Sequence, residues 1–241
     1  MIKLHFKKII PAFTFLLWIS FPSMAQRAAG TVNIIGQMKN VMWKGELQGN
    51  IHIDTLTVKT NLYGLGPVEY LKGEILVMDG VSYQSRVVND TMMIVEETYD
   101  IKAPFFSYAH ITGWSRQPLP GDVRTIRQLE IYLDSLTRSA PRPFLFKLTG
   151  IVEQADIHIV NLPAGARVRS PDEAHTGQKT FELKNEASDI LGFFSTGHQA
   201  VFTHHDSFLH MHLITTDRRK MGHLDQALFK KGTMTLYLPA D

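Results

Sequence analysis

The chain has 241 residues, of which 44% are hydrophobic and 20% charged, and its formal net charge is +2. This is the composition of an ordinary globular protein, and because there is no basic run we expect no nucleic-acid partner. Since cysteine is absent, no disulfide stabilises the fold, and any metal must be held by histidine and carboxylate.

The first 25 residues have the pattern of a signal peptide. Residues 1–8 carry three lysines, residues 9–21 form an apolar run, and Ser23 and Ala25 are small residues before the expected cut. The alternative, a membrane anchor, is disfavoured because the run is short for a span. We predict cleavage after Ala25, export to the periplasm or the extracellular space, and a mature chain of residues 26–241 with no membrane association.

The next part of the chain has the pattern of short strands. The pair Asp79–Gly80 between two apolar runs is typical of a tight β-hairpin. Residues 52–59 predict a short helix or turn in a glycine-punctuated segment. The strands expected here are 31–38, 74–78, 81–87, 91–96 and 104–111.

One longer helix is predicted in the middle of the chain, with Asp122 as its N-cap. Its buried stripe is Val123, Ile126, Leu129, Leu133 and Leu136, at three- and four-residue steps. Beyond it we expect a polar loop at 164–177 and strands at 144–149, 151–159, 178–184, 187–194, 208–215 and 233–238. Such a chain predicts an α+β fold of mixed, largely antiparallel sheets, as one compact domain or two closely packed lobes.

The most informative motif is a His-x-His pair on a predicted strand. His210 and His212 project to the same face, while the apolar residues between and beside them face the other way. His223 follows a glycine 11 residues later, which leaves room for a turn and a return. Three imidazoles with an open fourth position are the ligand set of a catalytic Zn²⁺. The alternative is a structural or solvent-exposed pair, since the chain has 11 histidines.

Five segments in order resemble the α-acetolactate decarboxylase family, over roughly residues 36–238. Segments of this chain are similar to five family motifs. In chain order, these motifs are a glycine-punctuated GDFGLGT, an LDGEMIVLDG run, TPFA, a GTLVGF strand and GFHLHFLSDDR…GGH. The matching residues are 61–67 (NLYGLGP), 71–80 (LKGEILVMDG), 103–106 (APFF), 189–193 (DILGF) and, within 208–223, FLHMHL, TDRR and GH.

The resemblance implies a zinc-dependent carboxy-lyase that converts acetolactate, a 2-hydroxy-3-oxo acid, to acetoin and CO₂. His210, His212 and His223 match the metal ligands, and Glu74 matches a glutamate that lines the family's pocket. Loss of CO₂ leaves a carbanion beside a ketone, which a Lewis acid can stabilise as an enediolate before a general acid protonates it. The resemblance also implies a homodimer, with an N-terminal lobe at about 31–140 and a C-terminal metal-binding lobe at about 144–241.

The chain departs from the family pattern at several positions. His158 stands where the family has an arginine, so it joins Glu74 as a candidate catalytic residue, and Pro67 replaces a threonine. The chain ends at Asp241, so we expect the family's second acidic residue, carried on a C-terminal extension, to be absent. These changes leave two alternatives open: an exported metal- or ligand-binding relative with a lost or changed reaction, and a hydrolase or hydratase that uses the same three-histidine zinc.

The remaining histidines are expected to be structural or solvated. His198, His204 and His205 lie in the loop before the predicted strand 208–215, which carries His210 and His212. One of these loop histidines could instead replace the family's second acidic residue. Surface or structural roles are expected for His52, His110 and His175. The glutamates Glu153 and Glu182 are expected to face solvent, and the aromatic pairs Phe105–Phe106 and Phe193–Phe194 to lie in the core.

Overall fold

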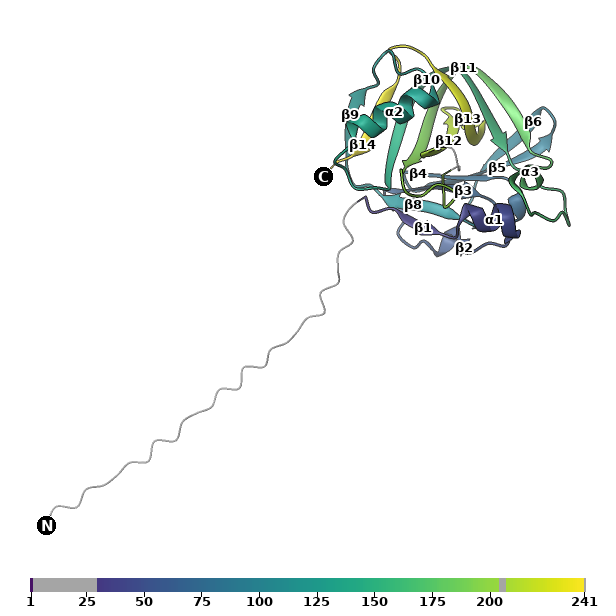
Figure 1. The fold of residues 1–241 in the computed structure, drawn as a ribbon, viewed down its shortest axis with the longest axis horizontal. Helices are drawn as coiled ribbons and strands as arrows, with labels where there is room; N and C mark the ends of the chain where they lie inside the picture. The colour runs from purple at the N-terminus through teal and green to yellow at the C-terminus, as the bar shows by residue number, and fades with distance from the viewer. Residues whose placement is uncertain (2–29, 204–206, 241) are drawn as a thin grey trace.

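The computed structural model describes Met1 and residues 30–203 and 207–240 (Figure 1). The predicted signal peptide, apart from Met1, and two of the loop histidines, His204 and His205, lie outside these residues. Within the described part of the chain, no helix is long and apolar enough to cross a membrane.

Two six-stranded sheets face each other, and every pairing between their named strands is antiparallel (Figure 1). The first runs in the order β1 (Asn33–Ile35), β8 (Phe106–His110), β3 (Leu62–Pro67), β4 (Glu74–Met78), β5 (Val81–Asn89) and β6 (Met92–Glu97). The second runs in the order β11 (Lys179–Phe194), β12 (Leu209–Thr215), β13 (Met221–Phe229), β10 (Phe144–Ile159), β14 (Thr235–Pro239) and β9 (Trp114–Pro118). The predicted α+β class with largely antiparallel sheets is therefore confirmed.

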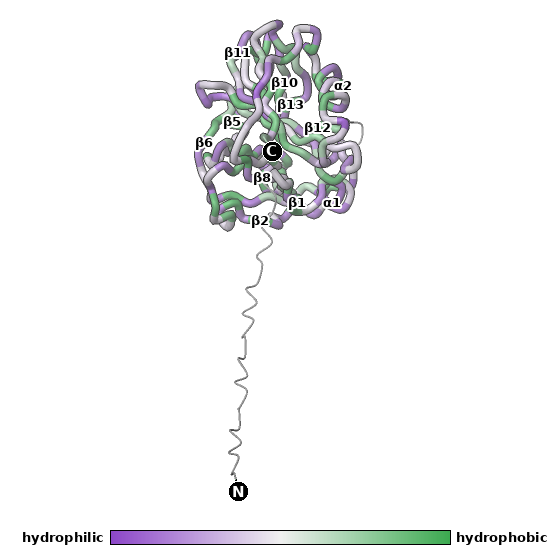
Figure 2. The backbone as a smooth tube through the Cα atoms, turned by 90° about the vertical axis from the view of Figure 1, so that its left-hand side faces the viewer, coloured by the Kyte–Doolittle hydropathy of each residue, from purple (hydrophilic) through white to green (hydrophobic). Residues whose placement is uncertain are grey.

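Few helices accompany the sheets. They are α1 (Met38–Lys44), α2 (Ile126–Leu136), α3 (Pro171–Ala174) and two 3₁₀ helices at Ile53–Thr55 and Glu69–Leu71. A short ladder of β2 (Ile51–His52) with β7 (Lys102–Ala103) lies outside the first sheet. Figure 2 shows hydrophobic stretches along strands of the interior and hydrophilic ones in the outer loops.

Strand β4 is buried on both faces, and its side chains alternate between two hydrophobic clusters. Leu76 packs between the sheets with Leu191 and Phe193 of β11. The intervening Ile75 packs on the other face with Ile53, toward the β2–β7 ladder. Because side chains on a strand alternate, Glu74 shares the face of Leu76 and points toward the second sheet.

The hairpin between β4 and β5 has the predicted turn, and β5 begins at the predicted Val81 but runs two residues beyond the predicted end, to Asn89. Asp79 and Gly80 have φ angles of 50° and 79°, and two positive φ values are what a two-residue hairpin turn of type I′ requires. The predicted strand at 74–78 has the observed bounds, and the turn at 52–59 contains the 3₁₀ helix Ile53–Thr55.

Several predicted elements differ from the observed ones. The predicted strand at 31–38 is interrupted by α1, which buries Met38, Val41 and Met42 at helical spacing. The longer helix begins after Thr125, not Asp122, because the Thr125 side chain accepts the Gln128 N–H and Gln128 caps in return. The predicted polar loop at 164–177 contains α3 and the buried Val168.

Two predicted strand pairs are each one continuous strand of 16 residues, β10 and β11, paired along nearly their whole length. Gly150 in β10 has a φ of 152° and Asn185 in β11 a φ of 53°. Both positions read as breaks in the sequence, yet the backbone passes through them without leaving the ladder. Since glycine and asparagine tolerate positive φ, they bend the strands without ending them.

The predicted lobe boundary at 140–144 stays a prediction, while membership of the two sheets changes between β8 and β9. Strand β9 already belongs to the second sheet, and α2 packs into that sheet's core through Leu129 and Leu133. The helix therefore belongs with the C-terminal strands, because its buried stripe lies against them.

Candidate metal centre

Three histidines form a row across three neighbouring strands of the second sheet. His212 of β12 pairs with His223 of β13, and His223 pairs in turn with His158 of β10. Directly paired residues project to the same face of a sheet. His210 lies two residues before His212 and joins the same face. The ring centroid of His223 lies 4.7 Å from that of His158 and 5.0 Å from that of His210.

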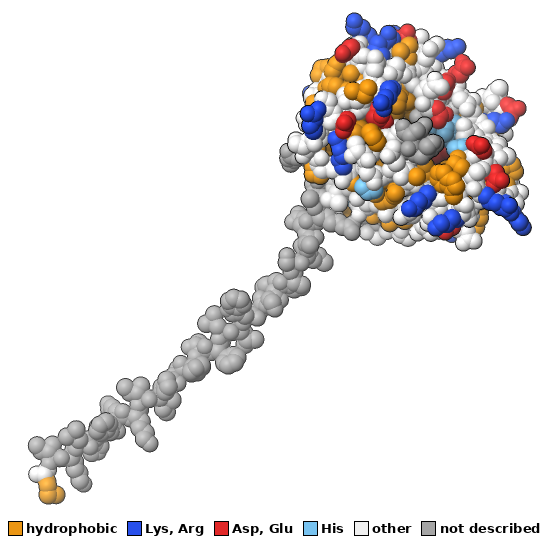
Figure 3. Space-filling model, viewed as in Figure 1, with side chains coloured by type: hydrophobic (Ala, Val, Ile, Leu, Met, Phe, Trp, Pro, Cys, Tyr) orange, Lys and Arg blue, Asp and Glu red, His pale blue; other side chains and the backbone are white. Residues whose placement is uncertain are grey.

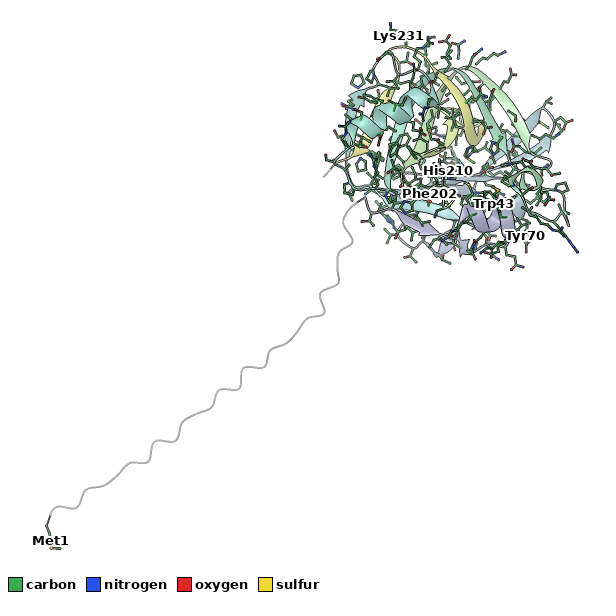
Figure 4. The ribbon with its side chains drawn as sticks, in the orientation of Figure 1. Met1, Trp43, Tyr70, Phe202, His210 and Lys231 are labelled. Atoms are coloured by element: carbon green, nitrogen blue, oxygen red, sulfur yellow. The ribbon has the colours of Figure 1, made fainter. Side chains whose placement is uncertain are left out.

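Gly222 allows the strands that carry His158 and His223 to approach each other closely. A Cβ at this position would lie 2.5 Å from the His158 carbonyl oxygen, closer than any side chain tolerates. The glycine that precedes His223 in the sequence therefore lets β13 approach β10. Figure 4 shows His210 in the interior of the molecule, where it is 3% exposed.

His210, His212 and His223 can hold one metal ion. Each offers one ring nitrogen, these nitrogens all lie within 4.8 Å of one another, and all three residues are buried. Among the described residues, neither ring nitrogen of His212 has a hydrogen-bond partner. Leaving a buried polar atom unpaired costs about 1–3 kcal/mol, so a metal ligand role accounts for an otherwise unfavourable side chain.

Burial also sets the charge of this site. It lowers the pKa of His212 to about 3, with nearby His158 adding to the shift and a weak contact with the Ile75 backbone opposing it. The imidazole is therefore neutral at physiological pH, which is the form that binds metal. Three imidazole ligands suit Zn²⁺ among the common metals.

Glu74 faces the histidines from the first sheet. Its Oε2 lies 3.6 Å from Nε2 of His212, and its Oε1 accepts a hydrogen bond of 3.1 Å from the Val160 N–H. The side chain is only 4% exposed. Burial raises the pKa of Glu74 well above its usual range, the Val160 N–H opposes this, and Asp225 adds to it. Glu74 can therefore carry a proton beside the metal ligands.

A small pocket opens between the sheets at this point. Its polar lining is Glu74 with His158, His175, His210 and His223. Its apolar lining is Met38 and Met42 of α1, Pro67 at the end of β3, Leu71 of the second 3₁₀ helix, Phe105 before β8 and Val160 after β10. Figure 3 shows histidine surface on one face of the molecule, beside acidic and hydrophobic side chains. The arrangement is a buried metal-ligand set with the carboxyl group of Glu74 opposite it.

The family model of the alpha-acetolactate decarboxylases matches residues 35–238. The chain belongs to the alpha-acetolactate decarboxylase family. It is 24% identical to the alpha-acetolactate decarboxylase of Brevibacillus brevis over 198 residues, which are 82% of this chain and 66% of that protein. It is also 24% identical to that of Lactococcus lactis over 201 residues, 80% of each chain. This chain thus spans just under two thirds of the Brevibacillus relative.

The fold agrees with solved structures of the family. The crystal structure of alpha-acetolactate decarboxylase from Bacillus subtilis superposes with a TM-score of 0.71 at 18% identity, over 87% of this chain and 86% of that one. A Staphylococcus aureus protein described as similar to alpha-acetolactate decarboxylase has the same TM-score at 17% identity, with the same coverage.

The structure brings together all five site residues that the sequence singled out. The three expected ligands converge, Glu74 faces them from the other sheet, and His158 lies beside His223 in the pocket wall. The family motif around Glu74 and the one around the histidines thus supply the two opposite walls of the pocket.

Two residues of this pocket region were missed. His175, expected to be structural, follows α3 and packs edge-on against His158 at 5.8 Å, in the pocket lining. Asp225 hydrogen-bonds to His158. Its spacing two residues after His223 could have placed it on the same face, but the sequence offered no sign of its partner.

Other histidines have the structural partners expected of them. His198 contacts Ser195 Oγ at 2.8 Å and stacks on Phe202. His52 pairs with Asp100, and His110 hydrogen-bonds to the Val58 carbonyl.

The expected core and surface residues also agree with the structure. The four expected core aromatics are buried: Phe105, Phe106, Phe193 and Phe194. The side chains of Glu153 and Glu182 are 43% and 73% exposed, as expected of solvent-facing strand residues.

Proposed function

We propose that this protein is a zinc-dependent carboxy-lyase that decarboxylates 2-acetolactate to acetoin and CO₂. The observation that carries the proposal is the buried three-histidine group opposite Glu74, in a chain of the acetolactate decarboxylase family. The named relatives support the substrate.

Zn²⁺ would be held by His210, His212 and His223, and the donor set fits it because their three buried ring nitrogens lie within 4.8 Å of one another and His212 is neutral. Bound there, zinc would supply a Lewis acid for the ketone and hydroxyl oxygens of the substrate. Because all three ligands are buried, water is largely excluded and the electrostatic effect is strengthened.

Glu74 would deliver the proton that completes the reaction. Loss of CO₂ leaves an electron pair on a substrate carbon, and one proton must reach that carbon. The Val160 N–H fixes Oε1, so Oε2 is the oxygen that faces the histidines and can carry the proton. Burial raises the pKa of Glu74, which favours the protonated carboxyl group that a general acid needs.

His158 would contact the substrate from the wall of the second sheet. It lines the pocket beside His223, and the apolar side chains of Met38, Met42 and Phe105 close the remaining walls. A polar group on one wall and apolar groups on the others would orient a small acid with its polar atoms toward the histidines.

The direct test measures metal and product on the same preparation. We expect about one zinc per chain by atomic absorption, and acetoin by its colour reaction when acetolactate is added. Chelation should abolish acetoin formation, and zinc should restore it. Protein that holds zinc but yields no acetoin would contradict the decarboxylase and favour a binding relative or a zinc hydrolase.

We further propose that the protein is exported, from the lysines, the apolar run and the small residues of positions 1–25. N-terminal sequencing of protein from the native host should begin at Gln26. An intact Met1 would contradict cleavage.

A further inference from the structure

His158 is anchored by a carboxylate on the neighbouring strand. Its Nδ1 lies 2.8 Å from each carboxylate oxygen of Asp225. The His158 side chain is 6% exposed and that of Asp225 is 34% exposed, so the hydrogen bond is shielded on the histidine side. Charge-assisted hydrogen bonds of this length are roughly twice as strong as neutral ones.

A β-bulge places Asp225 where it can make this bond. Along β10 and β13, Asp156 pairs with Gln226 and Ile157 pairs with Leu224, so Asp225 is the extra residue between them. Bulges turn a side chain out of its regular direction and are common beside active sites. Here the extra residue directs its carboxylate to the histidine that continues the row of metal ligands.

The carboxylate has a second histidine within reach, and distance decides between them. Asp225 Oδ1 lies 4.0 Å from Nε2 of His223, which is beyond hydrogen-bond length. The bond to His158 at 2.8 Å is therefore the one that Asp225 makes. Asp225 thus supports the histidine outside the metal-ligand group.

The bond fixes which nitrogen of His158 carries the proton. A carboxylate can only accept hydrogen bonds, so Nδ1 must donate, and Nε2 is the nitrogen that remains for the pocket. The ring is held between His223, stacked at 29°, and His175, packed at 81°. We propose that Asp225 is a positioning residue, which holds His158 in the Nδ1–H form so that Nε2 meets the substrate; this rests on the function proposed above.

The first test reads the tautomer and needs no activity. Long-range ¹H–¹⁵N spectra of histidine-labelled protein, metal-free and zinc-loaded, should show His158 as the Nδ1–H form, with its signals assigned by their loss in His158→Gln. In Asp225→Asn the amide can donate instead, so the Nε2–H form should appear. Asp225→Glu keeps an acceptor and should retain Nδ1–H.

The second test separates positioning from structure. In a Ser-His-Asp triad, the corresponding Asp→Asn exchange lowers kcat about 10⁴-fold because the histidine takes the wrong tautomer. Asp225→Asn should accordingly lower kcat for acetolactate by about 10²–10⁴-fold, with KM and zinc content nearly unchanged. The matched control is Asp189→Asn, which removes another partly buried carboxylate of this sheet, bonded to Arg218 at 2.7 Å; it should leave kcat and tautomer unaltered.

Three results would overturn the inference. They are an Nε2–H tautomer of His158 in the unsubstituted protein, an Asp225→Asn variant with the kcat and tautomer of the control, and loss of zinc from Asp225→Asn, which would make Asp225 a support of His223. If the unsubstituted protein makes no acetoin, the proposed function fails, while the tautomer spectra still decide the inference. If Asp225→Asn does not fold, the spectra of the unsubstituted protein decide it.

Discussion

The two walls of the pocket differ in how far apart their residues lie along the chain. The second sheet supplies the metal ligands from two strands joined by a short turn, with His212 and His223 directly paired. The first sheet supplies Glu74, whose side chain accepts a hydrogen bond from Val160, 86 residues away in the sequence. The histidine wall is thus a product of local pairing, whereas the carboxyl group reaches the site only when the two sheets pack together.

The largest effect is expected from breaking the histidine wall. The double substitution His210→Ala and His212→Ala removes two of three ligands, so zinc should fall from about one per chain to none and acetoin formation should vanish. Atomic absorption and the acetoin assay measure this. His110→Ala, which alters a histidine bonded to the Val58 carbonyl, should keep both. Retention of stoichiometric zinc by the double variant would overturn the ligand assignment.

Substitution on the opposite wall should separate metal from turnover. In Glu74→Gln, the amide oxygen can still accept the Val160 N–H, but the side chain can no longer deliver a proton to the substrate carbon. Turnover should drop by about two to four orders of magnitude, while zinc content and melting temperature stay nearly constant. Glu153→Gln, at a solvent-facing carboxylate, is the control and should be close to normal. Near-normal turnover in Glu74→Gln would mean that its carboxyl group takes no part in the chemistry.

The packing between the two sheets can be weakened without changing any residue of the pocket. Leu76 is fully buried between the sheets, so Leu76→Ala should lower the free energy of unfolding by about 2–5 kcal/mol. Urea unfolding of the metal-free protein measures this. Ile94→Ala, at a side chain that is 39% exposed, should change it by less than about 0.5 kcal/mol. Equal effects would contradict an inter-sheet core at Leu76.

The smallest effect tests the start of α2, whose Leu129 and Leu133 pack in the second sheet's core. Thr125→Ala removes the capping box and should cost about 0.5–2 kcal/mol of unfolding free energy. Asp122→Ala should cost clearly less, because the N-cap is Thr125, three residues later. The reverse order in urea unfolding would restore Asp122 as the N-cap.

Local patterns predicted the histidine wall and the hairpin because period-2 alternation and turn chemistry act over a few residues. His210 and His212 had to share a face, and Asp79–Gly80 had to turn. Local patterns could not predict which distant residues join the metal ligands in the pocket. The resemblance to the family, and not periodicity, singled out Glu74 and His158.

Features that depend on irregular backbone were missed. The bulge at Asp225 arises from an offset between two strands, and neither strand shows it in its own sequence. The predicted strand ends at residue 184, before Asn185, whereas in the structure Asn185 takes a φ of 53° and β11 stays paired with β10 before and after it. His175 follows a one-turn helix whose position against His158 is set by tertiary packing.

The three strands that carry the histidines close a ring with β11, because β10 pairs with β11, β11 with β12, β12 with β13, and β13 with β10. Each of these strands therefore has a hydrogen-bonded neighbour on both sides. Where a zinc finger gains its fold from the metal, this ring orders the imidazoles without it. Amide hydrogen exchange at Met211 and Leu224 should accordingly be as slow in metal-free protein as in the rest of the core, and metal binding should carry little ordering entropy.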